Sequence, residues 1–480
     1  MKILFATDTY FPASNGTTTL IYHLSEKLIG QGHEVHILAP GFSLGGESYV
    51  QDNGAIVHGV PTVSVPLYPD FRLPVLPVLK RVVRKHFGDI EPDVVHIHHH
   101  FIIGKAVFEV AKELDLPIMG TNHFMPENLL HYFPIPGFLY DRVRKYAWGK
   151  MFAVYEQLDL VTTPTQIAVD VLKKVGFRKE VIPLSNGINL ERFNGKIDGG
   201  KMRKKYKLAH KKVLIFVGRL DEEKRIDLLF DALRAIAKKV DIALLVVGKG
   251  KLRKKLDGLV RELGLADKVT FSGYVADRDL PAVYKAADAF VMPGDAELQS
   301  IATLEAMASG LPIVAANAVA LPMLVKNGKN GYLFKSGDAV DLASKIIKIF
   351  SNDKLRAGMA RESLVMAKSH DLRKVSLQYE SFYRKLIAGH RREEKVVGSY
   401  QEASELLVPR FKFVLTFAVA ILVLTVLTVT FAFNSPSDIK AEGAKWISKL
   451  KVSDIADKGV VKVKSGFQML EHTIKENTLR

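Results

Sequence analysis

Short apolar runs alternate with amphipathic stretches over most of the chain. In the N-terminal half, runs that predict strands lie at 3–6, 34–38, 93–97, 117–120 and 158–162. Apolar residues three to four positions apart predict helices between them, at 17–31 and 105–114. Strands that alternate with helices in this way indicate a doubly wound parallel sheet.

The same alternation starts again after the basic stretch 201–212. KVLIFVG, ALLVVG, KVTFSG, AFVMPG and PIVAAN predict strands, with helices from 224, 252 and 280. The fold class is therefore α/β, with two Rossmann-like doubly wound domains that face each other across a cleft. We expect an N-terminal acceptor-binding domain at 1–185, a C-terminal nucleotide-binding domain at 186–370, and a helix at 371–390 that packs back on the first domain.

Residues 413–433, FVLTFAVAILVLTVLTVTFAF, carry no charge over 21 positions. At 1.5 Å per residue such a helix is about 30 Å long, which is enough to cross a bilayer. A buried core helix is the alternative, but core helices of this length seldom lack a polar face. The sequence predicts a linker at 391–412, one transmembrane helix at 413–433, and a tail at 434–480 whose role it does not indicate.

The orientation of that span is not decided by charge, because basic residues flank it on both sides. The N-terminus, MKILFATDTYFP, has too short an apolar run for a signal peptide. We therefore expect a protein of the cytoplasmic membrane with its catalytic domains in the cytosol.

The composition of the chain excludes some kinds of site and favours one kind of partner. The chain has no cysteine, which excludes disulfides, thiolate metal sites and cysteine nucleophiles. Its formal net charge of +17 favours an anionic partner: nucleic acid, a membrane surface or a phosphorylated substrate. No helix-turn-helix, zinc finger or RNA-binding motif is present, so nucleic acid is not expected.

Open α/β sheets bind ligands at the carboxyl ends of their strands, and the second domain carries charged residues there. Gly218 and Arg219 end its first strand, and Lys224 is expected to begin the next helix. Ser300 lies where the helix that carries Glu305 should begin, so free backbone N–H groups face the same cleft. Cations beside a helix N-terminus predict a site for a nucleotide diphosphate, with Glu305 on the ribose and Glu297 on the sugar.

Two stretches, GRLDEEKRID and ELQSIATLEAMASGLPIV, closely resemble the retaining GT-B glycosyltransferases of family 4. The E-x7-E motif of that family matches Glu297 and Glu305, and its phosphate-binding pair matches Arg219 and Lys224. The N-terminal loop DTYFPASNGTTT resembles the family's Gly-containing loop. The resemblance implies that Asn15 and Gly16 close over the donor phosphates and that the active-site histidine falls on His123. It covers residues 1–390.

The resemblance implies transfer of a hexose with retention, without metal, enzymic nucleophile or cofactor beyond the nucleotide-sugar donor, for which UDP-glucose is favoured. Arg219, Lys224 and the helix N-terminus would stabilise charge on the leaving diphosphate, while His123 orients the sugar. ELQS, DTYFP and TNHFMPENLLHYF are most similar to the diacylglycerol glucosyltransferase and phosphatidylinositol mannosyltransferase-like subgroup, which implies a membrane lipid acceptor.

The sequence leaves other functions open. The acceptor could be phosphatidylinositol or a polyprenyl-linked glycan, with mannosyl or another hexosyl transfer. From a different class, the chain could be an inactive, membrane-tethered nucleotide-sugar-binding module. The oligomeric state is not indicated.

One position departs from the family pattern. Ser300 stands where relatives usually have glycine in E-x-Q-G, and its Oγ could crowd the donor. Serine can still cap the helix. We therefore expect serine in place of glycine at position 300 to affect the affinity for the donor.

Two further motifs suggest metal sites but are better explained otherwise. Asp277-Arg278-Asp279 is formally Asp-x-Asp, yet it precedes a predicted helix, where aspartate commonly caps. His96, His98, His99 and His100 end a strand, so alternate side chains point apart and cannot all converge on one ion. We expect a polar lining of the cleft from these histidines, and no metal.

The segment 72–87, RLPVLPVLKRVVRKHF, interleaves apolar and basic side chains. It could form a solvated helix over the sheet. The favoured interpretation is a helix on an anionic membrane surface, with its apolar face in the headgroups.

Overall fold

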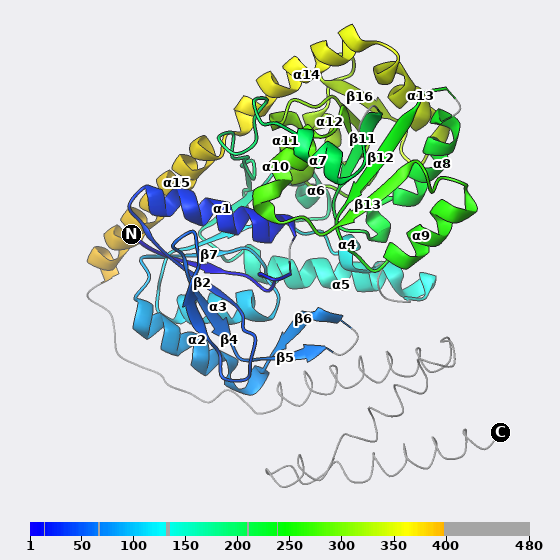
Figure 1. Ribbon diagram of the computed structural model, residues 1–480. Coiled ribbons are helices and arrows are strands. Elements are labelled where there is room, and N and C mark those ends of the chain that lie inside the picture. Colours follow the sequence, from blue (N-terminus) through cyan, green and yellow to red (C-terminus); the bar gives the residue numbers. More distant parts are fainter. Residues whose placement is uncertain (14, 66–67, 131–134, 209–210, 238, 398–480) are drawn as a thin grey trace, which may run out of the picture. The chain divides into compact units, whose positions relative to one another are not determined.

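The computed structural model describes residues 1–397 apart from 14, 66–67, 131–134, 209–210 and 238 (Figure 1). The predicted span 413–433 and the tail 434–480 lie outside the described residues. Within the part of the chain that is described, no helix is long and apolar enough to cross a membrane.

The N-terminal domain is built on an eight-stranded sheet in the order β10-β9-β8-β7-β1-β2-β4-β3. Its strands are β1 (Lys2–Ala6), β2 (Glu34–Pro40), β3 (Ser48–Val50), β4 (Ile56–Val60), β7 (Val94–Ile97), β8 (Ile118–Thr121), β9 (Leu160–Thr163) and β10 (Ile182–Pro183). All neighbours are parallel except β3 and β4. A separate hairpin pairs β5 (Thr62–Val65) with β6 (Tyr68–Pro74). The five predicted strands are therefore present in one sheet.

Helices follow the strands as in a doubly wound domain. They are α1 (Gly16–Gly30), α2 (Leu76–Ile90), α3 (Ile102–Glu113), α4 (Glu127–Leu130), α5 (Gly137–Tyr155) and α6 (Gln166–Lys174). Asn15 begins α1, because its side chain accepts a hydrogen bond from the backbone N–H of Thr18 at 2.9 Å.

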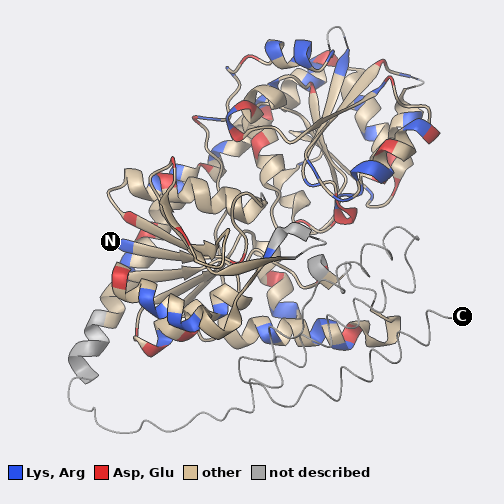
Figure 2. Cartoon of the chain, turned by 60° about the horizontal axis from the view of Figure 1, so that its bottom comes forward, with Lys and Arg blue, Asp and Glu red and all other residues tan. Residues whose placement is uncertain are grey.

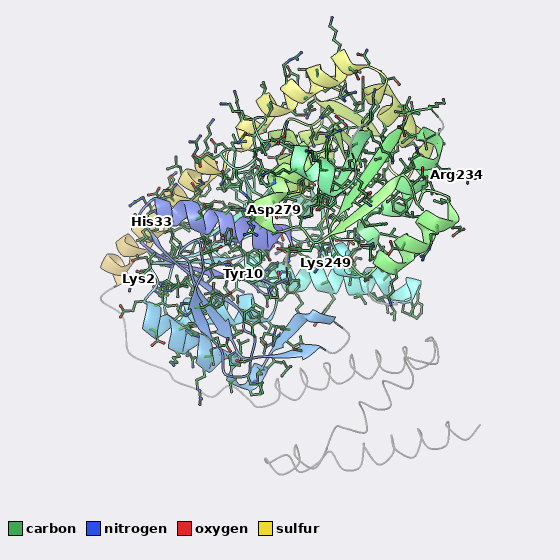
Figure 3. All side chains as sticks on the ribbon, in the orientation of Figure 1. Lys2, Tyr10, His33, Arg234, Lys249 and Asp279 are labelled. Atoms are coloured by element: carbon green, nitrogen blue, oxygen red, sulfur yellow. The ribbon has the colours of Figure 1, made fainter. Side chains whose placement is uncertain are left out.

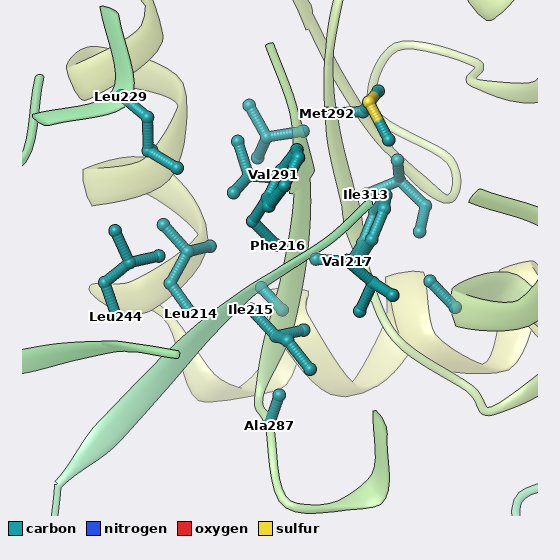
Figure 4. Close-up of a cluster of buried hydrophobic side chains, with 14 of the residues drawn as sticks. Leu214, Ile215, Phe216, Val217, Leu229, Leu244, Ala287, Val291, Met292 and Ile313 are labelled. Carbon is teal, nitrogen blue, oxygen red and sulfur yellow. The ribbon is translucent and has the colours of Figure 1, made fainter. Parts of the chain in front are cut away.

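The C-terminal domain holds a six-stranded, all-parallel sheet in the order β13-β12-β11-β14-β15-β16. The strands are β11 (Lys212–Val217), β12 (Ile242–Val247), β13 (Val269–Gly273), β14 (Ala289–Met292), β15 (Ile313–Ala316) and β16 (Gly331–Phe334). The helices are α7 (Gly200–Lys205), α8 (Ile226–Ile236), α9 (Arg253–Glu262), α10 (Leu280–Lys285), α11 (Ile301–Ala308), α12 (Leu321–Leu324), α13 (Ala339–Phe350) and α14 (Asp353–Ala367). The central strand β11 is almost wholly apolar, and its side chains from Leu214 to Val217 pack in a cluster of buried hydrophobic residues (Figure 4).

Two local predictions in this domain are wrong. Lys224 does not begin a helix: it ends a short 3₁₀ turn (Glu222–Lys224), and α8 starts at Ile226 because Arg225 is left-handed, with φ of 48°. Asp277 and Asp279 likewise lie in a 3₁₀ turn, and neither side chain makes a capping hydrogen bond.

The last described helix, α15 (Leu372–Val397), follows the C-terminal domain in sequence but packs on the N-terminal one. Tyr379 and Tyr383 on it are fully buried in the cluster beneath α1. Tyr383 also reaches the strand end of β7, where its hydroxyl lies 2.7 Å from His96 Nδ1.

The segment 72–87 differs from the favoured prediction. Four apolar side chains on one side of α2 are buried, and the helix packs on α3 and β4: Leu79, Val83, Phe87 and Ile90. On its outer side, Lys80 pairs with Glu113 of α3 at 2.6 Å. The prediction of an apolar face in the headgroups is wrong, because the protein's own core already covers that face.

Positive charge is not concentrated in that segment. Lys and Arg lie on helices of both domains (Figure 2). The net charge therefore does not point to one surface without further argument.

Candidate active site

The predicted cations follow the carboxyl end of β11. Lys224 Nζ donates a hydrogen bond to Glu297 Oε1 and forms an ion pair with it. Both side chains are less than one-fifth exposed. Arg219 is half exposed; its Nη1 lies 2.7 Å from Asp221 Oδ2 and its Nη2 2.7 Å from Glu223 Oε1. The structure therefore brings Lys224 and Glu297 together directly and holds Arg219 by two carboxylates that the sequence analysis did not single out.

The loop after β11 packs closely against the loop after β12. Gly218 donates its N–H to the Val247 carbonyl at 3.0 Å. A Cβ on Gly248, where φ is 135°, would lie only 1.9 Å from the carbonyl oxygen of Gly218. This contact fixes the backbone that presents Arg219.

Ser300 and Glu305 lie on α11. Ser300 caps the helix, with Oγ accepting from the Thr303 N–H at 3.3 Å, as the sequence predicts. Glu305 is buried and accepts a hydrogen bond from the Tyr284 hydroxyl at 2.7 Å. Burial raises the pKa of Glu305 to about 7. Tyr284 was missed, since a tyrosine inside an apolar helix gives no signal in sequence.

The N-terminal loop meets the same helix. A Cβ built on Gly16 would lie 3.4 Å from Cδ1 of Ile301, the first residue of α11. Asn15 is fixed beside it, since its Nδ2 donates to Thr9 Oγ at 3.0 Å. The N-terminus of α1 therefore lies next to that of α11, and two helix N-termini side by side favour an anion.

The stretch between the two glutamates is tied to the N-terminal domain. Gln299 is buried, and its Nε2 donates to Ser185 Oγ at 3.1 Å. Thr165, the cap of α6, donates to the Leu298 carbonyl at 3.0 Å. Both domains thus position the loop that carries Glu297. Lys249 after β12 and Tyr10 after β1 mark the carboxyl ends of the two sheets in Figure 3.

His123 follows β8 and is half buried. Its Nε2 lies 3.2 Å from His98 Nδ1, with the two rings 11° from parallel. Burial lowers the pKa of His123 to about 3, and lowers that of His98 well below its usual value. Within the described residues, no hydrogen bond joins His123 to Arg219 or to Lys224.

The four histidines at the end of β7 and in the loop after it are not the polar cleft lining that was expected. They are all less than one-tenth exposed: His96, His98, His99 and His100. His96 bonds Thr121 Oγ at 2.7 Å as well as Tyr383, and His99 bonds Thr7 Oγ at 2.9 Å. In this buried layer, Tyr383 of α15 covers His96, Thr7 after β1 contacts His99, and Tyr155 of α5 packs on His100; the sequence of the strand alone does not reveal these partners.

Asp277 pairs with a cation. Arg192 Nη1 lies 2.5 Å from Asp277 Oδ2 and 2.7 Å from His23 Nε2 of α1, so the guanidinium joins the two domains. Among the described residues, no group of three or more His, Asp or Glu is arranged to hold a metal ion.

Comparison with known proteins assigns both domains to glycosyltransferase families. Residues 14–192 match the family model "Glycosyltransferase Family 4", and residues 199–364 match "Glycosyl transferases group 1". The chain is 27% identical to a GDP-mannose-dependent alpha-mannosyltransferase of Corynebacterium glutamicum, over 71% of this chain and 78% of that one. It is 29% identical to an alpha-monoglucosyldiacylglycerol synthase of Streptococcus pneumoniae, over 72% of this chain and 78% of that one.

Among solved structures, the chain is similar to Anabaena Alr3699/HepE in complex with UDP-glucose. The TM-score is 0.64 at 21% identity, covering 80% of this chain and 100% of that one. This similarity establishes the fold of the two-domain part.

Proposed function

The chain belongs to the family 4 glycosyltransferases and is a hexosyltransferase of the GT-B fold; from that premise we propose that it moves a hexose, with retention, from a nucleotide sugar to a membrane lipid. UDP-glucose is the favoured donor and diacylglycerol the favoured acceptor class. The proposed reaction needs no metal and no cofactor.

The observation that carries the donor site is the meeting of α1 and α11 beside the Lys224–Glu297 pair. A diphosphate placed there would receive backbone N–H groups and the charge of Lys224 and Arg219. Glu305, further into α11, would accept from the ribose, and Glu297 would exchange part of its bond to Lys224 for sugar hydroxyls. That the related fold of HepE was solved with UDP-glucose supports this donor.

In the proposed mechanism the leaving diphosphate itself takes the acceptor proton, so the chain supplies charge and position. Lys224 and Arg219 stabilise negative charge on the diphosphate as the glycosidic bond breaks. His123, whose low pKa keeps the imidazole neutral at physiological pH, orients the sugar through hydrogen bonds rather than as an acid.

The lipid acceptor is supported by the Streptococcus relative, which is named as a glucosyldiacylglycerol synthase. The Corynebacterium relative, named as a mannosyltransferase, favours the second candidate, which is mannosyl transfer from GDP-mannose to phosphatidylinositol or a polyprenyl-linked glycan. With either acceptor, the catalytic domains would work at the cytosolic face of the membrane.

The test is incorporation of radiolabelled sugar into extractable lipid. The full chain, in anionic vesicles that contain diacylglycerol, is given UDP-glucose, UDP-galactose or GDP-mannose separately, with Arg219→Ala as the blank. Label in a neutral glycolipid from UDP-glucose is expected. Donor hydrolysis without labelled lipid would contradict diacylglycerol as the acceptor. Label in lipid only when GDP-mannose is supplied would contradict UDP-glucose as the donor.

A further inference from the structure

Helix α5 leaves one side uncovered. Its buried side consists of Trp148, Met151, Val154 and Tyr155. The opposite side carries two large aromatic rings eight residues apart, Phe138 and Tyr146, which are 81% and 65% exposed. Exposed apolar patches that are rimmed by polar residues mark interaction surfaces for protein or membrane.

Cations surround these two rings. Arg142, Lys145 and Lys150 are exposed at helical spacing on the same face, and Lys150 Nζ lies 5.1 Å from the centre of the Tyr146 ring. The acidic Asp141 lies to one side and is paired with Arg144 at 3.1 Å. The face is therefore positive and amphipathic, which is complementary to an anionic bilayer surface.

The contrast with α2 shows why this face matters. The apolar side of α2 is buried in the core, and its Lys80 and Arg84 both pair with Glu113. Helix α5 has uncovered aromatic rings, which α2 lacks, and they lie beside cations that have no carboxylate opposite them in the described contacts.

The other side of α5 is connected to the site. Trp148 Nε1 donates to Glu127 Oε1 at 3.1 Å, and Arg144 lies 3.8 Å from the same carboxylate. Glu127 begins α4, only four residues after His123. A bilayer that binds the exposed face would therefore be separated from the segment that carries His123 by the width of one helix, about 10 Å.

We propose that the α5 face, defined by Phe138, Arg142, Lys145, Tyr146 and Lys150, docks on an anionic lipid bilayer. The two rings enter the headgroup region and the three cations lie on lipid phosphates. This inference rests on the proposed lipid acceptor, and it replaces the segment 72–87 as the membrane-facing surface.

The absence of native cysteine allows a site-specific test on the full chain. An environment-sensitive fluorophore is attached to Gly149→Cys on the α5 face, to Gly88→Cys on α2, or to Gly258→Cys on α9. A Cβ at each of these glycines meets nothing within 4 Å, so the three sites are matched. The labelled proteins are reconstituted into vesicles of phosphatidylcholine, with or without phosphatidylglycerol. Any membrane tether elsewhere in the chain is then common to all samples.

We expect the label at Gly149 to shift to the blue when phosphatidylglycerol is present, and the labels at Gly88 and Gly258 to stay unchanged. Replacing Arg142, Lys145 and Lys150 by glutamine should weaken this local docking on the order of 100-fold, since each cation near an anionic surface contributes about a factor of five. The matched control replaces three exposed lysines of α7 by glutamine, Lys201, Lys204 and Lys205, and should change nothing.

Three results would overturn the proposal: a label at Gly149 that ignores phosphatidylglycerol, a response at Gly88 instead, or a Gly149 label already shielded without lipid, which would mean that protein covers the face. The measurement needs no donor. Docking without a glycolipid product would refute the proposed function alone, and product without docking would refute only the α5 surface.

Discussion

The two domains offer opposite chemistry at the ends of their strands. The N-terminal domain presents buried histidines whose pKa values are lowered by desolvation, so they are neutral. The C-terminal domain presents cations that are already held by carboxylates: Lys224 by Glu297, and Arg219 by Asp221 and Glu223.

This difference suggests which domain orients the sugar and which domain binds the diphosphate. A neutral imidazole such as His123, held by His98 of the buried layer, suits directional hydrogen bonds to sugar hydroxyls, because it adds no charge that competes with the diphosphate. Paired cations suit a ligand that brings two phosphates, because the ligand can share or displace the carboxylates. The histidine layer should therefore govern orientation, and the ion pairs should govern charge.

The largest effect is expected where charge is removed. Arg219→Ala or Glu297→Ala should lower turnover at least about 100-fold with folding intact, because charge on the leaving diphosphate is no longer balanced or the sugar no longer held. Steady-state rates with circular dichroism measure this, and Lys255→Ala on α9 is the control. Near-normal rates in either variant would remove the residue from the site.

A smaller effect is expected on the histidine side. His98→Leu removes the only hydrogen bond of His123 in the described part of the chain, and should lower kcat on the order of tenfold while the KM for donor changes little. His98→Asn keeps a polar atom near the position of Nδ1 and should recover much of that loss. Equal losses in the two variants would mean that His98 acts only through packing.

The pH dependence should come from the C-terminal domain. The pKa of Glu305 is about 7, so the ionised acceptor is lost as pH falls below that value, and donor affinity should fall about tenfold by pH 6. His123, with a pKa of about 3, should add no transition there. Donor titration across pH measures this, and Glu305→Gln should give weak binding without the transition.

Protonation of Glu305 does not destabilise the fold over that pH range. Because burial raises the pKa of Glu305 in the folded state above its unfolded value of 4.5, protonation favours the folded state as pH falls from 7. The contribution of this group to the free energy of unfolding should therefore increase over the range in which binding weakens.

The smallest effect is expected at Ser300. Its Oγ is bonded to the Thr303 N–H and the residue is buried, so it does not extend toward a donor. Ser300→Gly should cost only a few tenths of a kcal/mol in unfolding free energy, with donor affinity nearly unchanged. A marked gain in affinity would show that the serine crowds the donor after all.

Much of the fold was predictable from local pattern. The runs at 3–6 and 93–97 became β1 and β7, because strands buried on both faces must be apolar throughout. The Ser300 cap and the closeness of Lys224 to Glu297 followed from motif spacing, since both lie on loops at one edge of one sheet. The catalytic roles of these residues stay predictions.

The sequence by itself determined the two α/β domains, the family and the kind of charge at the donor site, because these depend on periodicity and on residues close together in the chain. Only the tertiary structure decided what is covered. It buried one side of α2 and the four histidines at the end of β7 and in the loop after it, and left Phe138 and Tyr146 of α5 exposed. Burial depends on which distant element packs on a face, as Tyr383 does on His96 across 287 positions, and a local pattern holds no record of that partner.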